Sequence, residues 1–212
     1  MWKGQAMEGK FIAFEGIDGS GKSTQVRLLS DRLRKEDIPF YATMEPTDSP
    51  IGSLIHQTMT GRVKTDNKVI AALFAADRLD HLLNDVNGIV EKINNGMNVI
   101  MDRYYFSSYA YQSVDVPMDW VIHANEQSSA ILRPTVNIFI DIDPDTALER
   151  IAKTRFQKEL FEEKSRLALV RQSYIEAFDR LQGVEQVAVV DGNGSTQEVA
   201  RDVWEIVKSY LI

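Results

Sequence analysis

Cysteine is absent from this sequence of 212 residues, which excludes disulfide bonds and thiolate metal sites. Long apolar runs are absent too, and no stretch approaches the roughly 20 residues that a membrane-spanning helix needs. The histidines, His56, His81 and His123, are scattered without the spacing of metal ligands, so we interpret them as structural or surface residues. We therefore expect a cytoplasmic protein with no membrane segment.

Positive charge is in deficit. The chain has 24 basic and 31 acidic residues, which gives a net charge of −7. This balance argues against a diffuse basic field, so we expect neither nucleic acid nor an anionic membrane as a partner. The hydrophobic share of 44% is typical of one globular core. We interpret residues 1–9 as a flexible extension and residues 10–212 as a single domain.

A glycine-rich segment follows the first apolar run of the chain, residues 11–14. Gly16, Gly21, Lys22 and Ser23 satisfy the pattern G-x-x-x-x-G-K-[ST]. Backbone amides of such a loop cradle phosphate oxygens, the lysine reaches the outer phosphates, and the hydroxyl binds Mg²⁺. The segment therefore predicts a nucleotide-binding site at the start of a helix.

A second polar cluster follows the apolar run 99–101. Asp102 at the end of this run could hold Mg²⁺ through water, and Arg103 could grip phosphate. Ser108 and Tyr111 are three residues apart on the next helix and could face one ligand. A capped helix with a tyrosine-rich packing face explains these residues equally well.

The pattern from residue 65 to residue 95 predicts one long helix. Phe74 and Arg78 are four residues apart and share a face, where a ring and a guanidinium could meet one flat ligand. Taken separately, Phe74 also fits the core and Arg78 fits an ion pair. The charged stretch 153–159 could be a solvated helix end or a mobile flap.

Short apolar runs alternate with helical patterns along the whole chain. This alternation predicts an α/β fold, with a parallel sheet covered by helices on both faces. The predicted strands are residues 11–14, 40–44, 99–101, 136–141 and 187–190, and the predicted helices include 23–36 and 196–211.

Five segments taken in order resemble the thymidylate kinases: FEGIDGSGKST, EPTDSPIG, LFAADRLDH, VIMDRYYFSSYAYQ and RPTVNIFIDIDPDTALERI. The resemblance implies a three-layer P-loop kinase fold, whose five-stranded parallel sheet has the order 2-3-1-4-5, with a short lid at about 153–160. It also implies a homodimer that transfers the γ-phosphate of ATP to dTMP, giving dTDP and ADP, with Mg²⁺ as the cofactor.

The resemblance also implies roles for particular residues. Phe74 would stack on thymine, and Tyr111 would lie under the sugar and disfavour a ribose. The implied catalytic residues are Asp18, Lys22, Arg103 and Arg155, and the implied metal-binding residues are Ser23 and Asp102. The implied ATP-binding residues are Gly16, Ile17, Asp18, Gly19, Ser20, Gly21, Lys22, Ser23, Thr24 and Arg150. The implied substrate-binding residues are Asp18, Phe74, Arg78, Arg103, Ser107, Ser108, Tyr111 and Gln112.

Two positions bear on the source of positive charge at the site. Met44 stands where the family often has arginine before Glu45-Pro46. The variable positions of the glycine loop, residues 17–20, contain no basic residue. Phosphoryl transfer generally needs a cation beyond the loop lysine and the metal, so we expect Arg155 in the lid to supply it, with Lys158 as the alternative.

Two other functions fit part of this evidence. A kinase for another nucleoside monophosphate would keep the same fold and loop. A nucleotide-dependent switch protein would share the loop, and residues 85–88 match D-x-x-G. However, this match lies inside the helix predicted for 65–95. The guanine-reading pattern N-K-x-D is also absent, because Asn67-Lys68 is followed by Val69-Ile70.

Overall fold

The computed structural model describes residues 9–152 and 160–211. The expectation for the extension at 1–9 lies outside these residues except at Gly9, whose N donates to Ile93 O at 2.9 Å, and the expectations for the lid cations Arg155 and Lys158 lie outside them entirely. Within the described ranges, every helix falls short of the length or the apolar character needed to cross a bilayer.

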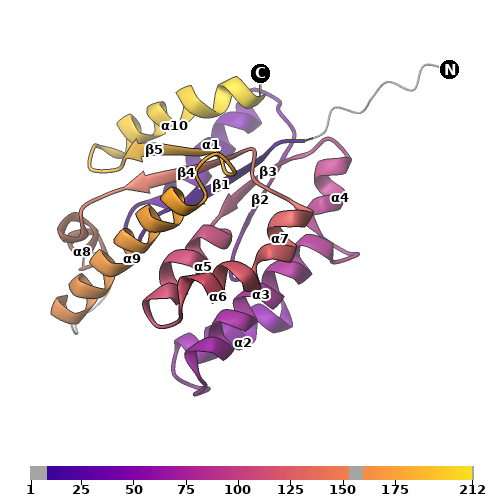
Figure 1. Cartoon of the computed structure of the whole chain (residues 1–212). Helices are drawn as coiled ribbons and strands as arrows, with labels where there is room; N and C mark the ends of the chain where they lie inside the picture. The colour runs from indigo at the N-terminus through magenta and orange to yellow at the C-terminus, as the bar shows by residue number, and fades with distance from the viewer. Residues whose placement is uncertain (1–8, 153–159, 212) are drawn as a thin grey trace.

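A five-stranded parallel sheet forms the middle layer of the fold (Figure 1). Its strands are β1 (Phe11–Glu15), β2 (Phe40–Met44), β3 (Asn98–Asp102), β4 (Val136–Asp141) and β5 (Val187–Asp191). They lie in the order β2-β3-β1-β4-β5, and every neighbouring pair is parallel. The predicted fold class and strand order are confirmed.

The central strand β1 is buried on both faces of the sheet. Phe11 and Ala13 belong to one hydrophobic core, whereas Ile12 and Phe14 belong to the other, because successive side chains of a strand point to opposite faces. A strand covered on both faces is apolar at nearly every position, and in β1 the exception is Glu15 at its end. Burial on both faces explains the continuous apolar runs in the sequence.

Helices cover both faces and give the fold three layers (Figure 1). On one face lie α1 (Lys22–Lys35) and α10 (Thr196–Leu211), which pack through Val26, Leu29, Val203 and Trp204. On the other lie α3 (Asn67–Leu83), α5 (Tyr105–Tyr111) and α9 (Leu160–Arg180). The remaining helices of the described residues are α2 (Pro50–Met59), α4 (Ile89–Asn94), α6 (Met118–Ala124), α7 (Glu126–Ile131) and α8 (Pro144–Ala152), and a 3₁₀ turn lies at Gln112–Val114.

The prediction of one helix from 65 to 95 is wrong, because α3 ends at Leu83 and α4 starts at Ile89. A local turn separates them: Asn84 Oδ1 accepts a hydrogen bond from Val86 N at 2.9 Å, and Gly88 N donates to Asn84 O at 2.8 Å. Asparagine competes with the helix in this way through its short polar side chain. Residues 85–88, which match D-x-x-G, therefore lie between helices rather than inside one.

Two adjacent valines of β5 test the layered core. Val190 is 3% exposed, whereas Val189 is 62% exposed. We expect Val190→Ala to lower the free energy of unfolding by about 2 kcal/mol, because it removes buried methyl groups and leaves a cavity. Val189→Ala is the matched control and should change it by under about 0.5 kcal/mol. Urea unfolding measures both values, and equal losses would contradict the assignment of these faces.

Candidate active site

The candidate site lies at the carboxyl edge of the sheet, where parallel strands end together. This edge is where open α/β sheets bind their ligands. The glycine loop follows β1, Glu45-Pro46 follows β2, Arg103 follows β3, and Gly192 follows β5. The sheet therefore gathers segments that are far apart in the sequence.

The glycine loop has the backbone geometry that its glycines predict. Gly16, Gly19 and Gly21 have φ angles of +145°, +80° and +97°, which side chains rarely allow. A Cβ atom at Gly16 would lie 2.7 Å from Ile140 O, and one at Gly19 would lie 2.6 Å from Ala147 O. Helix α1 begins directly after Gly21, so its first amides can donate to phosphate oxygens.

Lys22 folds back onto this loop. Its Nζ donates hydrogen bonds to Gly16 O and Ile17 O, both at 2.9 Å, and it is 5% exposed. Burial, followed by the charge of Arg103, lowers the pKa of Lys22 to about 8. Anionic phosphate would offset this penalty on the charged ammonium, so the site is suited to an anionic ligand.

Ser23 and Asp102 form the pair predicted to hold the metal. Ser23 Oγ donates to Asp102 Oδ2 at 2.5 Å. Asp102 is 8% exposed, and its Oδ1 has no hydrogen-bond partner among the described residues. The described residues contain no cluster of three or more metal-binding side chains. One hydroxyl and one carboxylate fit Mg²⁺, which usually takes its other ligands from phosphate and water.

Arg103 occupies an unusual position at the end of β3. Its φ angle of +71° is uncommon for a residue with a side chain, and such outliers gather at functional sites. Its guanidinium donates to Asp18 Oδ1 at 2.5 Å and to Ser107 Oγ at 3.1 Å. Its Cζ also lies 4.8 Å from the centre of the Tyr111 ring. The cation is therefore aimed at the glycine loop from the β3 side.

Two cavities meet at Asp18 and Arg103. The first is about 650 Å³ and is lined by Gly19, Gly21, Lys22, Ser23, Asp102, Arg150 and Gly192, among others. The second is about 470 Å³ and is lined by Pro46, Met59, Ile70, Phe74, Tyr111 and Gln112, among others. Both cavities also include Asp18, Arg103 and Ile151. The geometry therefore suits two ligands whose reacting ends meet beside the glycine loop.

Comparison with known proteins identifies this arrangement. The model of the thymidylate kinase family matches residues 14–203. The chain belongs to the thymidylate kinase family. A thymidylate kinase of Symbiobacterium thermophilum is 36% identical over 209 residues, covering 95% of this chain and 94% of the relative. A probable thymidylate kinase of Pyrobaculum calidifontis is 37% identical over 199 residues, with 93% and 95% covered. A thymidylate kinase of Leptospira borgpetersenii is 31% identical over 196 residues, with 92% of each covered.

This membership confirms the predictions of family, enzyme class and thymidylate kinase function made from the sequence. The residue roles implied by the resemblance remain predictions, and the structure places them as follows. Phe74, Ser107, Tyr111 and Gln112 line the second cavity. Burial raises the pKa of Tyr111 to about 12, although Arg103 opposes this rise, so the phenol is neutral at pH 7.

Arg78 and Ser108 lie behind the wall of the second cavity rather than on it. Each is 1% exposed. Arg78 pairs with Glu45 Oε2 at 2.7 Å, donates to Ser108 Oγ at 3.2 Å, and also contacts Asn125 Oδ1. The structure therefore pairs Arg78 with Ser108 and with other protein groups, while Phe74 and Tyr111, with which the sequence analysis paired them, line the cavity itself.

Arg150 joins two loops of the first cavity. Its guanidinium donates to Gly192 O at 2.9 Å and to Ser20 O at 3.5 Å. These bonds tie the glycine loop to the loop after β5. Met44, which stands where the thymidylate kinase family often has arginine, is 61% exposed and also lines this cavity.

Glu15 is a site residue that the sequence reasoning missed. It is 0% exposed, and its carboxylate accepts hydrogen bonds from Tyr104 N at 2.8 Å, Ser107 Oγ at 2.6 Å and Tyr174 OH at 3.0 Å. Burial raises the pKa of Glu15, and these bonds oppose the rise. The feature of the sequence that could have identified Glu15 is an acidic residue directly before the glycine loop, at the end of an otherwise apolar strand.

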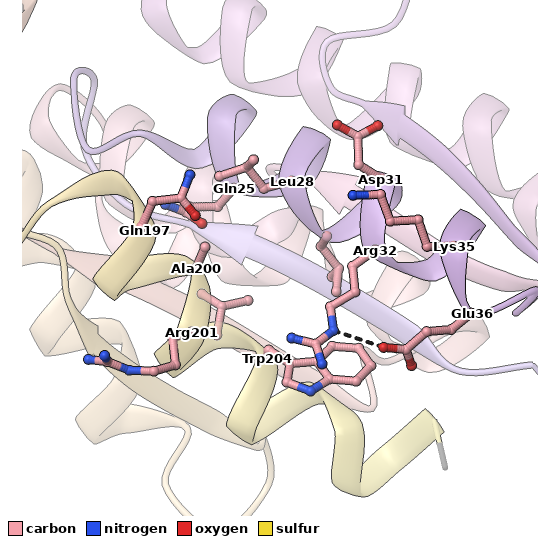
Figure 2. A pocket seen from close by; sticks show the side chains of 12 residues that line it. Gln25, Leu28, Asp31, Arg32, Lys35, Glu36, Gln197, Ala200, Arg201 and Trp204 are labelled. Carbon is pink, nitrogen blue, oxygen red and sulfur yellow. Dashed lines mark hydrogen bonds and ion pairs between the residues drawn. The ribbon is translucent and has the colours of Figure 1, made fainter.

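A further hollow of about 560 Å³ lies between α1 and α10, on the outer surface of that helical layer (Figure 2). Arg32 lies over the ring of Trp204, 3.7 Å from its centre, and its Nε donates to Glu36 Oε1 at 2.9 Å (Figure 2). Because the charge of Arg32 is already paired with Glu36, we assign this hollow no part in the reaction.

The shifted pKa of Lys22 predicts a pH-dependent stability. The unfolded chain keeps a pKa of about 10.5, against about 8 in the fold, so the unfolded chain binds more protons between these values. Raising the pH through this range therefore favours the folded wild type relative to Lys22→Met, by about 3 kcal/mol at most.

Denaturant unfolding at several pH values measures this difference. Lys35→Met, at an exposed position of the same helix, is the matched control for the loss of one positive charge. A difference between wild type and Lys22→Met that stays constant with pH would contradict the prediction.

Proposed function

We propose that this member of the thymidylate kinase family transfers the γ-phosphoryl group from ATP in the first cavity to dTMP in the second, giving dTDP and ADP. The observation that carries the proposal is the meeting of the two cavities at Asp18 and Arg103. The glycine loop in the first cavity supports a triphosphate there. The second cavity has the apolar and aromatic lining that a nucleobase needs.

Positive charge around the transferred phosphoryl group would stabilise the transition state of the transfer. Lys22 would exchange its loop carbonyls for the outer phosphates, where its charge counts most as the phosphoryl group loosens. Arg103 would bind the acceptor phosphate through its planar fork. Ser23 and Asp102 would hold Mg²⁺, which neutralises charge on the phosphates when it is bound. The acceptor is already an oxyanion, so no general base is needed.

The second cavity supports an acceptor with a flat base. Phe74 would stack on thymine, with Gln112 beside it. Arg78 and Ser108 would meet its polar edge from behind the cavity wall, where each would exchange a protein partner for the base. Tyr111 would lie under the sugar. Its hydroxyl accepts a hydrogen bond from Asp18 N at 2.8 Å, which supports a fixed position for the ring. Arg150 would lie against adenine in the first cavity.

The assembly and location follow the family resemblance. We propose a homodimer in the cytoplasm, with residues 10–212 acting as one domain and residues 153–160 as its lid. The absence of cysteine is compatible with a reducing compartment.

An acceptor panel tests the proposed function. We expect dTMP to be the best acceptor and ribonucleoside monophosphates to be poor, because Phe74 and Tyr111 line the acceptor cavity. A coupled assay of ATP consumption with dTMP, dUMP, CMP, UMP and GMP gives the order. Faster turnover of CMP, UMP or GMP would favour a kinase for another monophosphate. ATP hydrolysis that ignores the added acceptor would favour a switch protein.

The source of the remaining cation is tested separately. Arg155→Ala should lower kcat by roughly a hundredfold with little change in dTMP affinity, as expected for an interaction made mainly in the transition state. Lys158→Ala is the matched comparison, since it removes a nearby charge of the same sign. Unchanged kcat in both variants would mean that the cation comes from elsewhere.

A further inference from the structure

The segment between β2 and α2, Glu45 to Ser49, forms part of the acceptor cavity through Pro46. Two consecutive residues of α3, Asp77 and Arg78, hold this segment on either side of Pro46. Consecutive helical residues do not face the same direction. Both nevertheless contact this one short segment, Arg78 through Glu45 and Asp77 through Thr47 and Ser49.

Asp77 holds the segment after Pro46. It is 1% exposed, and its Oδ2 accepts a hydrogen bond from Thr47 N at 2.8 Å. Its Oδ1 accepts from Thr47 Oγ1 at 2.5 Å and from Ser49 Oγ at 3.1 Å. These three donors replace water around a buried carboxylate, and losing one would leave charge poorly solvated.

Arg78 holds the segment before Pro46, through the Glu45 pair described above. His81, one turn further along α3, lies on the same carboxylate, with Nδ1 3.3 Å from Glu45 Oε1. Its Nε2 lies 2.9 Å from Thr43 Oγ1 on β2. Glu45 is therefore fixed by two α3 side chains, one of which also reaches the strand.

The effect of Asp77 extends to helix α2. Ser49, which donates to Asp77, also caps α2 by accepting a hydrogen bond from Gly52 N at 3.2 Å. The packing there is tight, because a Cβ atom at Gly52 would lie 1.8 Å from Thr47 O. Helix α2 ends at Met59, which lines the acceptor cavity. Asp77 thus supports two parts of one cavity wall.

We infer that Asp77 is a positioning residue for the acceptor: it fixes Pro46 and the start of α2 against Phe74, and so sets the width of the base pocket. The inference rests on the proposed function. Asp77 lines neither cavity, and its hydrogen bonds go to Thr47 and Ser49. Glu45, at the other end of the segment, lines the first cavity but is held by Arg78 and His81. The influence of Asp77 is therefore expected on the acceptor side.

Asp77→Asn tests the inference with little change in volume. The amide has no charge and keeps only one acceptor oxygen, so it cannot accept from all three donors at once. We expect the KM and Kd for dTMP to rise roughly tenfold or more, as for a lost hydrogen bond to a charged group, while the KM for ATP stays within about twofold. Steady-state kinetics measure the KM for dTMP and for ATP, and calorimetric titration of dTMP without ATP measures its Kd.

Asp80→Asn is the matched control, since Asp80 lies on the same helix and its side chain accepts a hydrogen bond from Asn84 Nδ2 at 3.3 Å, away from the segment that Asp77 holds. It should behave as wild type. Unchanged dTMP affinity in folded Asp77→Asn would overturn the inference, as would equal losses for dTMP and ATP. If Asp77→Asn does not fold, Thr47→Val is the second test. It keeps the carboxylate but loses the bond from Thr47 Oγ1 to Asp77 and the bond that Thr47 Oγ1 accepts from Ser49 N at 3.1 Å, and it should weaken dTMP binding severalfold. An unchanged Kd there would also overturn the inference.

The wild-type titration separates this inference from the proposed function. Wild-type protein that does not bind dTMP would contradict the function itself. Wild-type protein that binds dTMP, alongside a variant that binds it equally well, would contradict only the role of Asp77.

Discussion

The site depends most on the hydrogen bonds that the buried carboxylate of Glu15 accepts. It is the last residue of β1, and it accepts hydrogen bonds from the start of α5 and from Tyr174 on α9. Ser107 bonds both Glu15 and Arg103, so the same carboxylate orients the arginine that faces the glycine loop. The Glu15 carboxylate therefore joins β1, the start of α5 and α9 at one point, one residue before the glycine loop that would bind the phosphates.

Basic side chains gather at this edge of the sheet although the protein as a whole is acidic. The net charge is −7, yet Lys22, Arg103 and Arg150 line the first cavity, beside the carboxylates of Asp18, Glu45 and Asp102. Each of these basic side chains already has protein partners, such as the loop carbonyls for Lys22 and Asp18 for Arg103. A ligand must exchange these partners for its own oxygens. Binding then favours ligands with several negative charges, because a single charge would gain little from the exchange.

The sequence predicted the sheet and the glycine loop well because both are local patterns. Apolar runs mark strands buried on both faces, and the loop residues lie within eight positions of one another. It did not predict the break at Asn84, because a single side-chain bond there outweighs the helical periodicity. It also missed the partners of buried carboxylates, since Glu15 and Tyr174 are 159 residues apart. Arg78 was placed on the right helix, but its pairing with Glu45 depends on how α3 crosses β2.

The central position of β1 in the sheet also has a consequence for how the chain folds. This strand pairs with β3 through Phe11 and Val99, and with β4 through Ile12 and Val136, so its neighbours are synthesised long after it. Contacts between distant parts of a chain form slowly, because a long loop must close first. The glycine loop cannot take its final shape until β4 stands beside it, since Gly16 packs against Ile140. A nucleotide that needs this loop shape therefore stabilises forms in which β4 is in place over forms in which it is not.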